Sequence, residues 1–175
     1  MRTARKSGGA NVRVWLALVG ATATACQPAA EVVLPEPEAI AAYYSYDGSL
    51  EADLNGNVAE ITVSQPAAQL RRGGALWARV GPYVLLFSEE TFNLMEENPG
   101  LAGVRVITKV ERGPEVARAL LVRGELSGVL WRRSLNIAGK ARLEGTERPT
   151  LLEDLVRWGE DHTEYKYNPR YTSSR

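Results

Sequence analysis

The dipeptide Asn55-Gly56 is the feature that most constrains how this chain can fold. Apolar and polar residues alternate before it, from Leu50 to Leu54, and again after it, from Ala59 to Val63. Alternation of this kind is typical of a strand with one buried face, and Asn-Gly between two such runs is the strongest short-range hairpin signal, because both residues tolerate positive φ. The sequence therefore predicts a β-hairpin over residues 50–63.

A second hairpin is predicted from "ALWARV", Gly81-Pro82 and "YVLLFS", which span residues 75–88. The run from Val84 to Phe87 is apolar at every position, as in a central strand that is buried on both faces. This interpretation places residues 83–88 in the middle of the sheet.

A short strand-helix-strand unit should follow over residues 83–110. Ser88 is a suitable N-cap, two glutamates favour the positive end of a helix dipole, and Asn98-Pro99-Gly100 is a typical helix end. The segment "VRVITKV" then returns as a strand. Because such a unit usually lays its strands side by side in the same direction, we expect residues 83–88 to pair in parallel with residues 104–110.

The second half of the chain is expected to be mainly helical. Apolar residues recur at spacings of three and four over residues 125–145, and "TLLE" at 150–153 has the capping-box pattern before an apolar stripe. Residues 114–123 are ambiguous: Pro114 favours a helix start, whereas the alternation up to Val122 would also suit a hairpin with residues 104–110. We predict a helix there.

The resulting fold class is α+β. N-terminal β-hairpins and a short strand-helix-strand unit should be followed by two or three C-terminal helices packed on the sheet. Residues 43–175 are predicted to form this single globular domain, and its last segment, "EYKYNPRYTSSR", is expected to be a polar, aromatic tail.

The segment "VWLALVGATATAC", from Val14 to Cys26, is the most apolar run in the chain. It is too short for a membrane-spanning helix, which needs about 20 apolar residues. Basic residues precede it, no acidic residue does, and small residues end it, as in a secretory signal peptide. Residues 1–25 are therefore predicted to be a cleaved signal peptide.

Cys26 is the only cysteine, so the chain cannot form an internal disulfide. The tetrapeptide "ATAC" resembles the lipobox of bacterial lipoproteins, although that family prefers Leu at position 23 and this chain has Ala. The resemblance implies cleavage before Cys26 and a diacylglycerol on its thiol. The alternative is ordinary cleavage after "ATA", which would leave Cys26 as a free thiol.

The proline-containing segment "QPAAEVVLPEPEA" completes the N-terminal region, and residues 26–42 are expected to be a lipidated cysteine and a flexible tether. The predicted location is therefore outside the cytoplasm, anchored by lipid on the periplasmic face of the outer or inner membrane or at the cell surface. Gln27, in place of the Asp that retains many lipoproteins at the inner membrane, mildly favours the outer membrane.

Loss of the signal peptide changes the charge balance of the chain. The full sequence has 21 basic and 21 acidic residues, and the four basic residues ahead of Cys26 are Arg2, Arg5, Lys6 and Arg13. The mature chain would have 17 basic and 21 acidic residues, a formal charge of about −4, which argues against a nucleic-acid partner.

Residues with obvious chemistry are few. His162 is the only histidine and lies near the end of the last predicted helix, where it suits the helix dipole, and no nucleophile motif accompanies it. The acidic pairs resemble solvated helix faces, and no stretch has the pattern of a calcium loop. We therefore expect no catalytic residues, no metal site and no cofactor.

Aromatic clusters are the best candidates for binding a partner. Tyrosine suits surfaces that are apolar on one edge and wet on the other, and Trp and Arg are enriched in binding hot spots. The alternative interpretation is that the tyrosines fasten the two termini to the domain. The candidate residues are Tyr43, Tyr44, Tyr46, Trp131, Arg132, Arg133, Tyr165, Tyr167 and Tyr171.

These features predict a non-catalytic lipoprotein of the cell envelope. Its partners would be the lipid bilayer, through acylated Cys26, and a protein of the envelope, for which it would act as an accessory or structural subunit or docking module. The alternative is a periplasmic lipoprotein that binds a small molecule in a pocket, and an undetected hydrolase is a third hypothesis. A contiguous exposed apolar patch would favour docking, and an apolar pocket with a few converging polar groups would favour a ligand.

Overall fold

The computed structural model describes residues 33–46 and 48–173, which belong to one compact unit. The predicted signal peptide, Cys26 and the first part of the expected tether lie outside the described residues. The architecture is α+β, as predicted, with one mixed sheet and six helices in the described residues.

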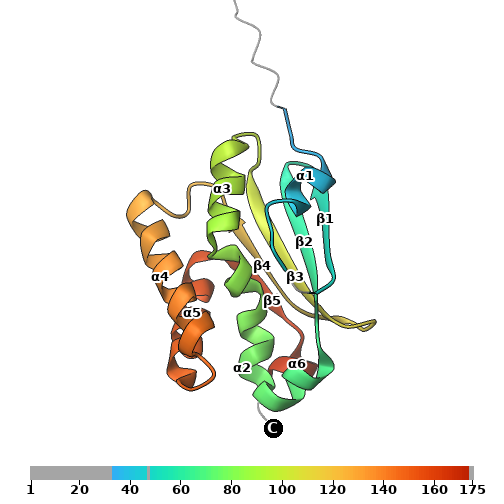
Figure 1. Cartoon of the computed structure of the whole chain (residues 1–175), viewed down its shortest axis with the longest axis vertical. Helices are drawn as coiled ribbons and strands as arrows, with labels where there is room; N and C mark the ends of the chain where they lie inside the picture. The colour runs from blue at the N-terminus through green and yellow to red at the C-terminus, as the bar shows by residue number, and fades with distance from the viewer. Residues whose placement is uncertain (1–32, 47, 174–175) are drawn as a thin grey trace, which may run out of the picture. The chain divides into compact units, whose positions relative to one another are not determined.

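Five strands form the sheet, in the order β1-β2-β3-β4-β5 (Figure 1). Strands β2 and β3 run parallel, and every other neighbouring pair is antiparallel. The bounds of the strands are β1 Leu50–Asn55, β2 Val58–Gln65, β3 Gly103–Val110, β4 Glu115–Val122 and β5 Glu164–Tyr167.

The first predicted hairpin is confirmed. Leu50 pairs with Val63 and Asn55 with Val58, so the turn residues are Gly56 and Asn57. Gly56 has φ of +63°, whereas Asn57 does not have positive φ. Positive φ at the first turn residue alone is the pattern of a type II′ turn, in which glycine takes the first central position.

The second predicted hairpin is wrong, because residues 75–86 belong to the long helix α2, Ala67–Leu86. The fully buried side chains of Val80, Tyr83 and Phe87 follow one another at helical spacings. Helix α2 contacts the sheet on one side and α5 on the other, so its sequence is apolar around much of its circumference. A short apolar run has no clear period in that setting and cannot distinguish a buried helix from a buried strand.

The parallel connection exists, but it is longer than expected. Helix α3, Glu89–Glu97, begins where the sequence predicts, and the Ser88 hydroxyl accepts a hydrogen bond from the Thr91 amide at 3.2 Å. The strand that runs parallel to β3 is β2 and not residues 83–88. Both α2 and α3 therefore lie in the crossover between the two parallel strands.

Residues 115–122 form strand β4, so the predicted helix over 114–123 is wrong and the hairpin alternative is correct. Ala119 pairs with Val106, and Leu121 pairs with Val104, which puts the buried side chains of both strands on one face. Pairing with β3 outweighs the helix-start preference of Pro114, because it buries the alternating apolar side chains of β4.

Two helices follow in the second half, as predicted: α4, Gly128–Glu144, and α5, Pro149–His162. The Ser127 hydroxyl caps α4 by accepting from the Leu130 amide. The predicted capping box at 150–153 is wrong, because α5 begins at Pro149 with Arg148 in the N-cap position and no side-chain cap. Proline is well suited to the first helical position, where its missing N–H costs no hydrogen bond.

Both terminal segments are more structured than expected. Helix α1, Pro37–Ala41, lies within the predicted tether, and Ile40 is fully buried. At the other end, the predicted tail forms β5 and helix α6, Pro169–Thr172. The folded domain therefore begins ahead of residue 43, and its sheet is completed by the end of the chain.

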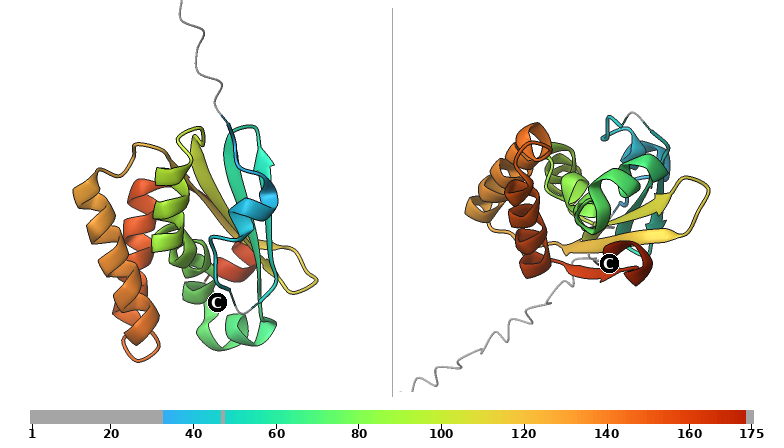
Figure 2. Two further views of the ribbon diagram at one scale, coloured as in Figure 1. Left: turned by 45° about the horizontal axis from the view of Figure 1, so that its top comes forward. Right: turned by 90° about the horizontal axis from the view of Figure 1, so that it is seen from below.

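The helices gather on one face of the sheet (Figure 2). The buried residues Ala59, Ile61 and Val63 of β2 alternate with partly exposed residues, and β3 and β4 show the same pattern. The core lies between this face and the helices, while the opposite face is open. Among the described helices, none has the length and apolar character needed to cross a membrane.

Candidate functional site

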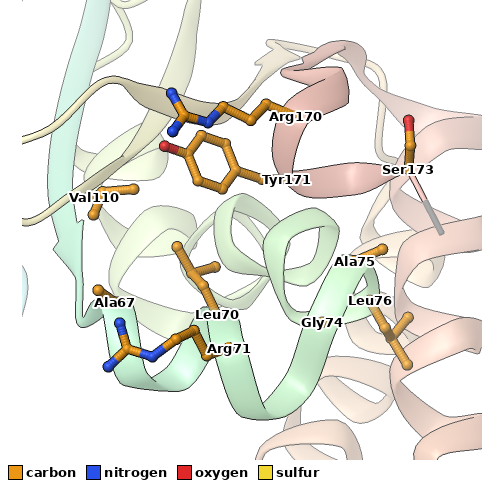
Figure 3. A pocket seen from close by; sticks show the side chains of 10 residues that line it. All are labelled: Ala67, Leu70, Arg71, Gly74, Ala75, Leu76, Val110, Arg170, Tyr171 and Ser173. Atoms are coloured by element: carbon orange, nitrogen blue, oxygen red, sulfur yellow. The ribbon is translucent and has the colours of Figure 1, made fainter. Parts of the chain in front are cut away.

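A cleft of about 800 Å³ lies between the first half of α2, the end of β3 and α6. Figure 3 shows its side chains. Helix α2 directly follows β2, so the cleft lies beyond the carboxyl ends of the two parallel strands, a common place for ligand sites in sheets with such crossovers. We call it the α2–α6 cleft; its lining is Ala67, Leu70, Arg71, Gly74, Ala75, Leu76, Val110, Arg170, Tyr171 and Ser173.

The floor of the α2–α6 cleft is apolar. Leu70, Val110 and Tyr171 pack against a small cluster that is separate from the main core and contains the fully buried Val116 and Ala117. A volume of this size lies within the range of about 300–1,000 Å³ that is usual for small-molecule sites. The floor can therefore take the apolar part of a ligand.

Two arginines give the cleft a positive charge. Arg71 comes from α2 and Arg170 from α6, and both residues are exposed. The Arg170 guanidinium carbon lies 5.7 Å from the centroid of the Tyr171 ring, within the range of a cation–π contact. Within residues 33–46 and 48–173, neither arginine forms an ion pair. Their charges are therefore available to an anionic group.

Gly74 determines the shape of this cleft, because α2 is kinked there. Its φ of +59° and ψ of −151° lie outside the helical region and in a region that is essentially restricted to glycine. The kink separates the first turns of α2 from the straight part that packs in the core. Those first turns carry Ala67, Leu70 and Arg71 to the cleft.

A partly buried polar network lies next to the cleft and connects α2, α5 and β5. The hydroxyls of Tyr83 and Tyr167 are 2.7 Å apart, and the Tyr167 hydroxyl donates to Glu160 at 3.0 Å. Glu160 also accepts from Arg79, whose guanidinium carbon lies 5.4 Å from the Tyr167 ring centroid. Burial raises the pKa of Tyr83 to about 12 and raises the pKa of Tyr167 still further. Both phenols stay protonated at neutral pH and hold the end of the chain in place.

The N-terminal tyrosines attach α1 and the segment after it to the domain. Tyr44 is buried, and its hydroxyl is 2.8 Å from the Thr91 hydroxyl. Tyr43 donates to Glu97 at 2.7 Å, and Tyr46 donates to the Ser64 carbonyl at 3.3 Å. These contacts match the alternative in which the tyrosines fasten a terminus.

The remaining candidate residues do not join the N-terminal tyrosines. Tyr165 and Tyr167 lie on β5, at the edge of the sheet opposite β1, and only Tyr171 lines the cleft. Trp131 is buried against Phe92, with ring centroids 5.2 Å apart. Arg133 covers the ring of Trp158, and Arg132 is exposed on α4. The predicted aromatic residues therefore do not form one surface.

His162 is the last residue of α5, as the sequence indicates. Its ring packs on Trp158 with a centroid distance of 4.2 Å, and its Nδ1 atom is 3.6 Å from a carboxylate oxygen of Glu125. Thr163 is the nearest hydroxyl in sequence, and it donates to the Gly159 carbonyl. Across residues 33–46 and 48–173, no group of three or more His, Cys, Asp or Glu side chains could hold a metal ion.

Sequence reasoning did not find the cleft. Its residues come from three separate segments of the chain, and none belongs to a recognisable motif. The clearest signal was "QLRRGGAL", where two glycines interrupt a helical segment beside two arginines. No protein-family model, no curated protein and no solved structure matches the chain.

Proposed function

We propose that the protein is a lipid-anchored binding protein of the cell envelope whose α2–α6 cleft takes a small amphipathic anion. The observation that carries this proposal is the combination of an apolar floor with two arginines that have no ionic partner in the described residues. A carboxylate would form charge-assisted hydrogen bonds with the guanidinium groups. The apolar part of the same molecule would cover Leu70, Val110 and Tyr171.

Ligand binding in the α2–α6 cleft agrees better with the positions of the side chains than protein docking through the aromatic clusters does. Tyr44 and Trp131 are buried, and the other tyrosines are divided between the two edges of the sheet. The proposal contains no catalytic step and no cofactor. Its location rests on the signal-like segment and on Cys26, which would hold the domain at the bilayer through its acyl chains.

Binding can be tested with decanoate and with decanol, which differ only at the polar end. We expect the Cys26→Ser chain, which has no lipid, to bind decanoate more tightly than decanol in a calorimetric titration. Arg71→Gln and Arg170→Gln should each weaken decanoate binding about tenfold, or about 1.4 kcal/mol, and leave decanol binding unchanged. Arg132→Gln, an exposed arginine on α4, is the matched control. Equal affinity for both probes, or no binding of either, would contradict the proposal.

Anchoring is tested separately in the cell. Cys26→Ala should move the protein from the membrane fraction to the soluble fraction, and the mature mass should lose its acyl groups. A variant that stays in the membrane fraction with an unchanged mature mass would show that Cys26 is not the anchor.

A further inference from the structure

The open face of the sheet has an uneven distribution of charge. Side chains on a strand alternate between the two faces, so the residues that alternate with the buried ones belong to the open face. On β1 and β2 its charged residues are all acidic: Glu51, Asp53 and Glu60. On β3, β4 and β5 the open face has four basic residues, Arg105, Lys109, Arg118 and Lys166, and two acidic residues, Glu115 and Glu164, so its basic residues are in excess there. Glu115 lies 3.5 Å from Arg118 in the same copy.

The strand register places these residues in rows across the sheet. One row runs from Glu51 through Thr62 and Ile107 to Arg118, in the order β1 to β4. In the next row Asp53, Glu60 and Arg105 are neighbours, and Glu60 forms an ion pair with Arg105. Both rows are acidic on the β1 and β2 side and have an arginine on β3 or β4, and the second row continues through Leu120 to the acidic Glu164 on β5. Thr62 and Ile107 form the uncharged middle of the first row.

From this pattern we infer that two copies of the chain associate through their open sheet faces. The twofold axis would run parallel to the strands, midway between the two faces and above the boundary of β2 and β3. This symmetry would place β1 of each copy over β4 of the other. Glu51 would then face Arg118 of the second copy, and Glu60 would face its Arg105. Because the two copies use the same surface, each of these residue pairs occurs twice in the dimer.

The size of the face is sufficient for such a contact. Four strands at about 4.8 Å spacing and about 26 Å length cover a flat area of about 500 Å² on each copy. Two copies would bury at least about 1,000 Å², the lower bound for a specific interface. Sheets that pack face to face lie about 10 Å apart, which leaves room for long charged side chains between them.

The pair Glu51 and Arg118 gives a selective test, because two strands separate these residues within one copy. Using the Cys26→Ser full chain, we expect a dimer in sedimentation equilibrium at up to about 100 µM. Glu51→Lys and Arg118→Glu each replace two attractive contacts by two repulsive ones. Each variant should raise the dissociation constant of the dimer about thirtyfold. An equimolar mixture of the two variants restores both attractive pairs and should dimerise like the unsubstituted protein.

Glu153→Lys provides the control, because Glu153 is exposed on α5, on the other side of the molecule from the open face, and the charge change is the same. This variant should dimerise normally. A monomer at every concentration would overturn the inference, as would a dimer that neither Glu51→Lys nor Arg118→Glu weakens. A mixture that remains monomeric while each variant alone is folded would also overturn it. The α2–α6 cleft does not enter this experiment, so its outcome is independent of ligand binding.

Discussion

The ring of Tyr83 on α2 occupies the space where a Cβ atom at position 159 of α5 would lie. Tyr83 is fully buried and Gly159 is buried. The two helices can approach this closely only because residue 159 has no side chain. The contact also positions the Tyr83 hydroxyl beside Tyr167, so the close packing of α2 and α5 and the attachment of β5 depend on the same residue.

We predict that Gly159→Ala destabilises the protein by about 1–3 kcal/mol, because the new methyl group must displace the Tyr83 ring. The measurement is the free energy of unfolding in urea. Gly139→Ala on α4 is the matched control, since its Cβ position has no described neighbour within 4 Å beyond the adjacent residues and the backbone of its own helix. That variant should gain up to about 1 kcal/mol from helix propensity, and an equal effect of both substitutions would contradict the packing argument.

A second prediction concerns the Tyr167 hydroxyl. Tyr167→Phe removes the hydrogen bonds to Tyr83 and Glu160 and should cost about 1–2 kcal/mol of unfolding free energy. Tyr165→Phe is the same chemical change two residues earlier on β5, at a residue that is 46% exposed. The hydroxyl of Tyr165 has no hydrogen-bond partner among the described residues, so this variant should stay within about 0.5 kcal/mol of the unsubstituted protein.

The buried phenols also predict loss of stability at alkaline pH. Burial raises the pKa of Tyr83 to about 12, against about 10 in the unfolded chain. Between these two pH values the unfolded state binds fewer protons than the folded state. The contribution of the Tyr83 phenol to the free energy of unfolding is therefore fully present below about pH 10 and is lost as the pH rises further. The midpoint of urea unfolding, measured from pH 8 to 11, should therefore decrease above pH 10. Tyr83→Phe should make the decrease less steep; a curve that is unchanged by this substitution would contradict the assignment.

Arg123 supports the end of α3 from the turn that precedes α4. Its guanidinium group donates to the carbonyls of Met95 and Asn98, each at 2.7 Å, and to the carbonyl of Leu101 at 2.5 Å. Arg123→Ala should cost about 2–3 kcal/mol, because it removes the guanidinium donor from the Met95 carbonyl in the last turn of α3 and from the Leu101 carbonyl. Arg132→Ala, on the exposed side of α4, is the control and should change stability by less than about 0.5 kcal/mol.

The kink at Gly74 leads to a prediction about the cleft. Gly74→Ala should cost about 1–3 kcal/mol, because its φ of +59° and ψ of −151° are strained for any residue with a Cβ. Beyond the adjacent residues and the local helix backbone, no described atom lies within 4 Å of the Cβ position, so this cost comes from the backbone conformation and not from a clash. Hydrogen exchange should show the largest increase in residues 67–73; an increase spread evenly through the sheet would contradict a local effect.

Local patterns predicted the elements whose signals lie within a few residues. The hairpin of β1 and β2 follows from Asn55-Gly56, the start of α3 from Ser88, and the α5 stripe from apolar residues at helical spacing. These elements depend on turn chemistry, capping and periodicity, which neighbouring residues provide. The α+β class follows from the same signals.

Residues 75–88 and 114–123 were assigned incorrectly because their conformation depends on distant partners. The helix α2 is buried between the sheet and α5, and β4 is a strand because β3 lies beside it. The aromatic end of the chain gave no sign that it would complete the sheet as β5. The cleft could not be predicted either, since Arg71 and Arg170 are almost a hundred residues apart in the sequence and meet only through the fold.

The sequence by itself determined the α+β class, the first hairpin and the helix cap at Ser88, and it contains the signal-like segment that ends at Cys26. Only the tertiary structure decided that residues 75–86 are helical, that β2 is the parallel partner of β3, and that two arginines share one apolar cleft. The physical reason is the range of the interactions involved. Turns and caps are made by adjacent residues, whereas strand pairing and burial become favourable only when distant segments pack together.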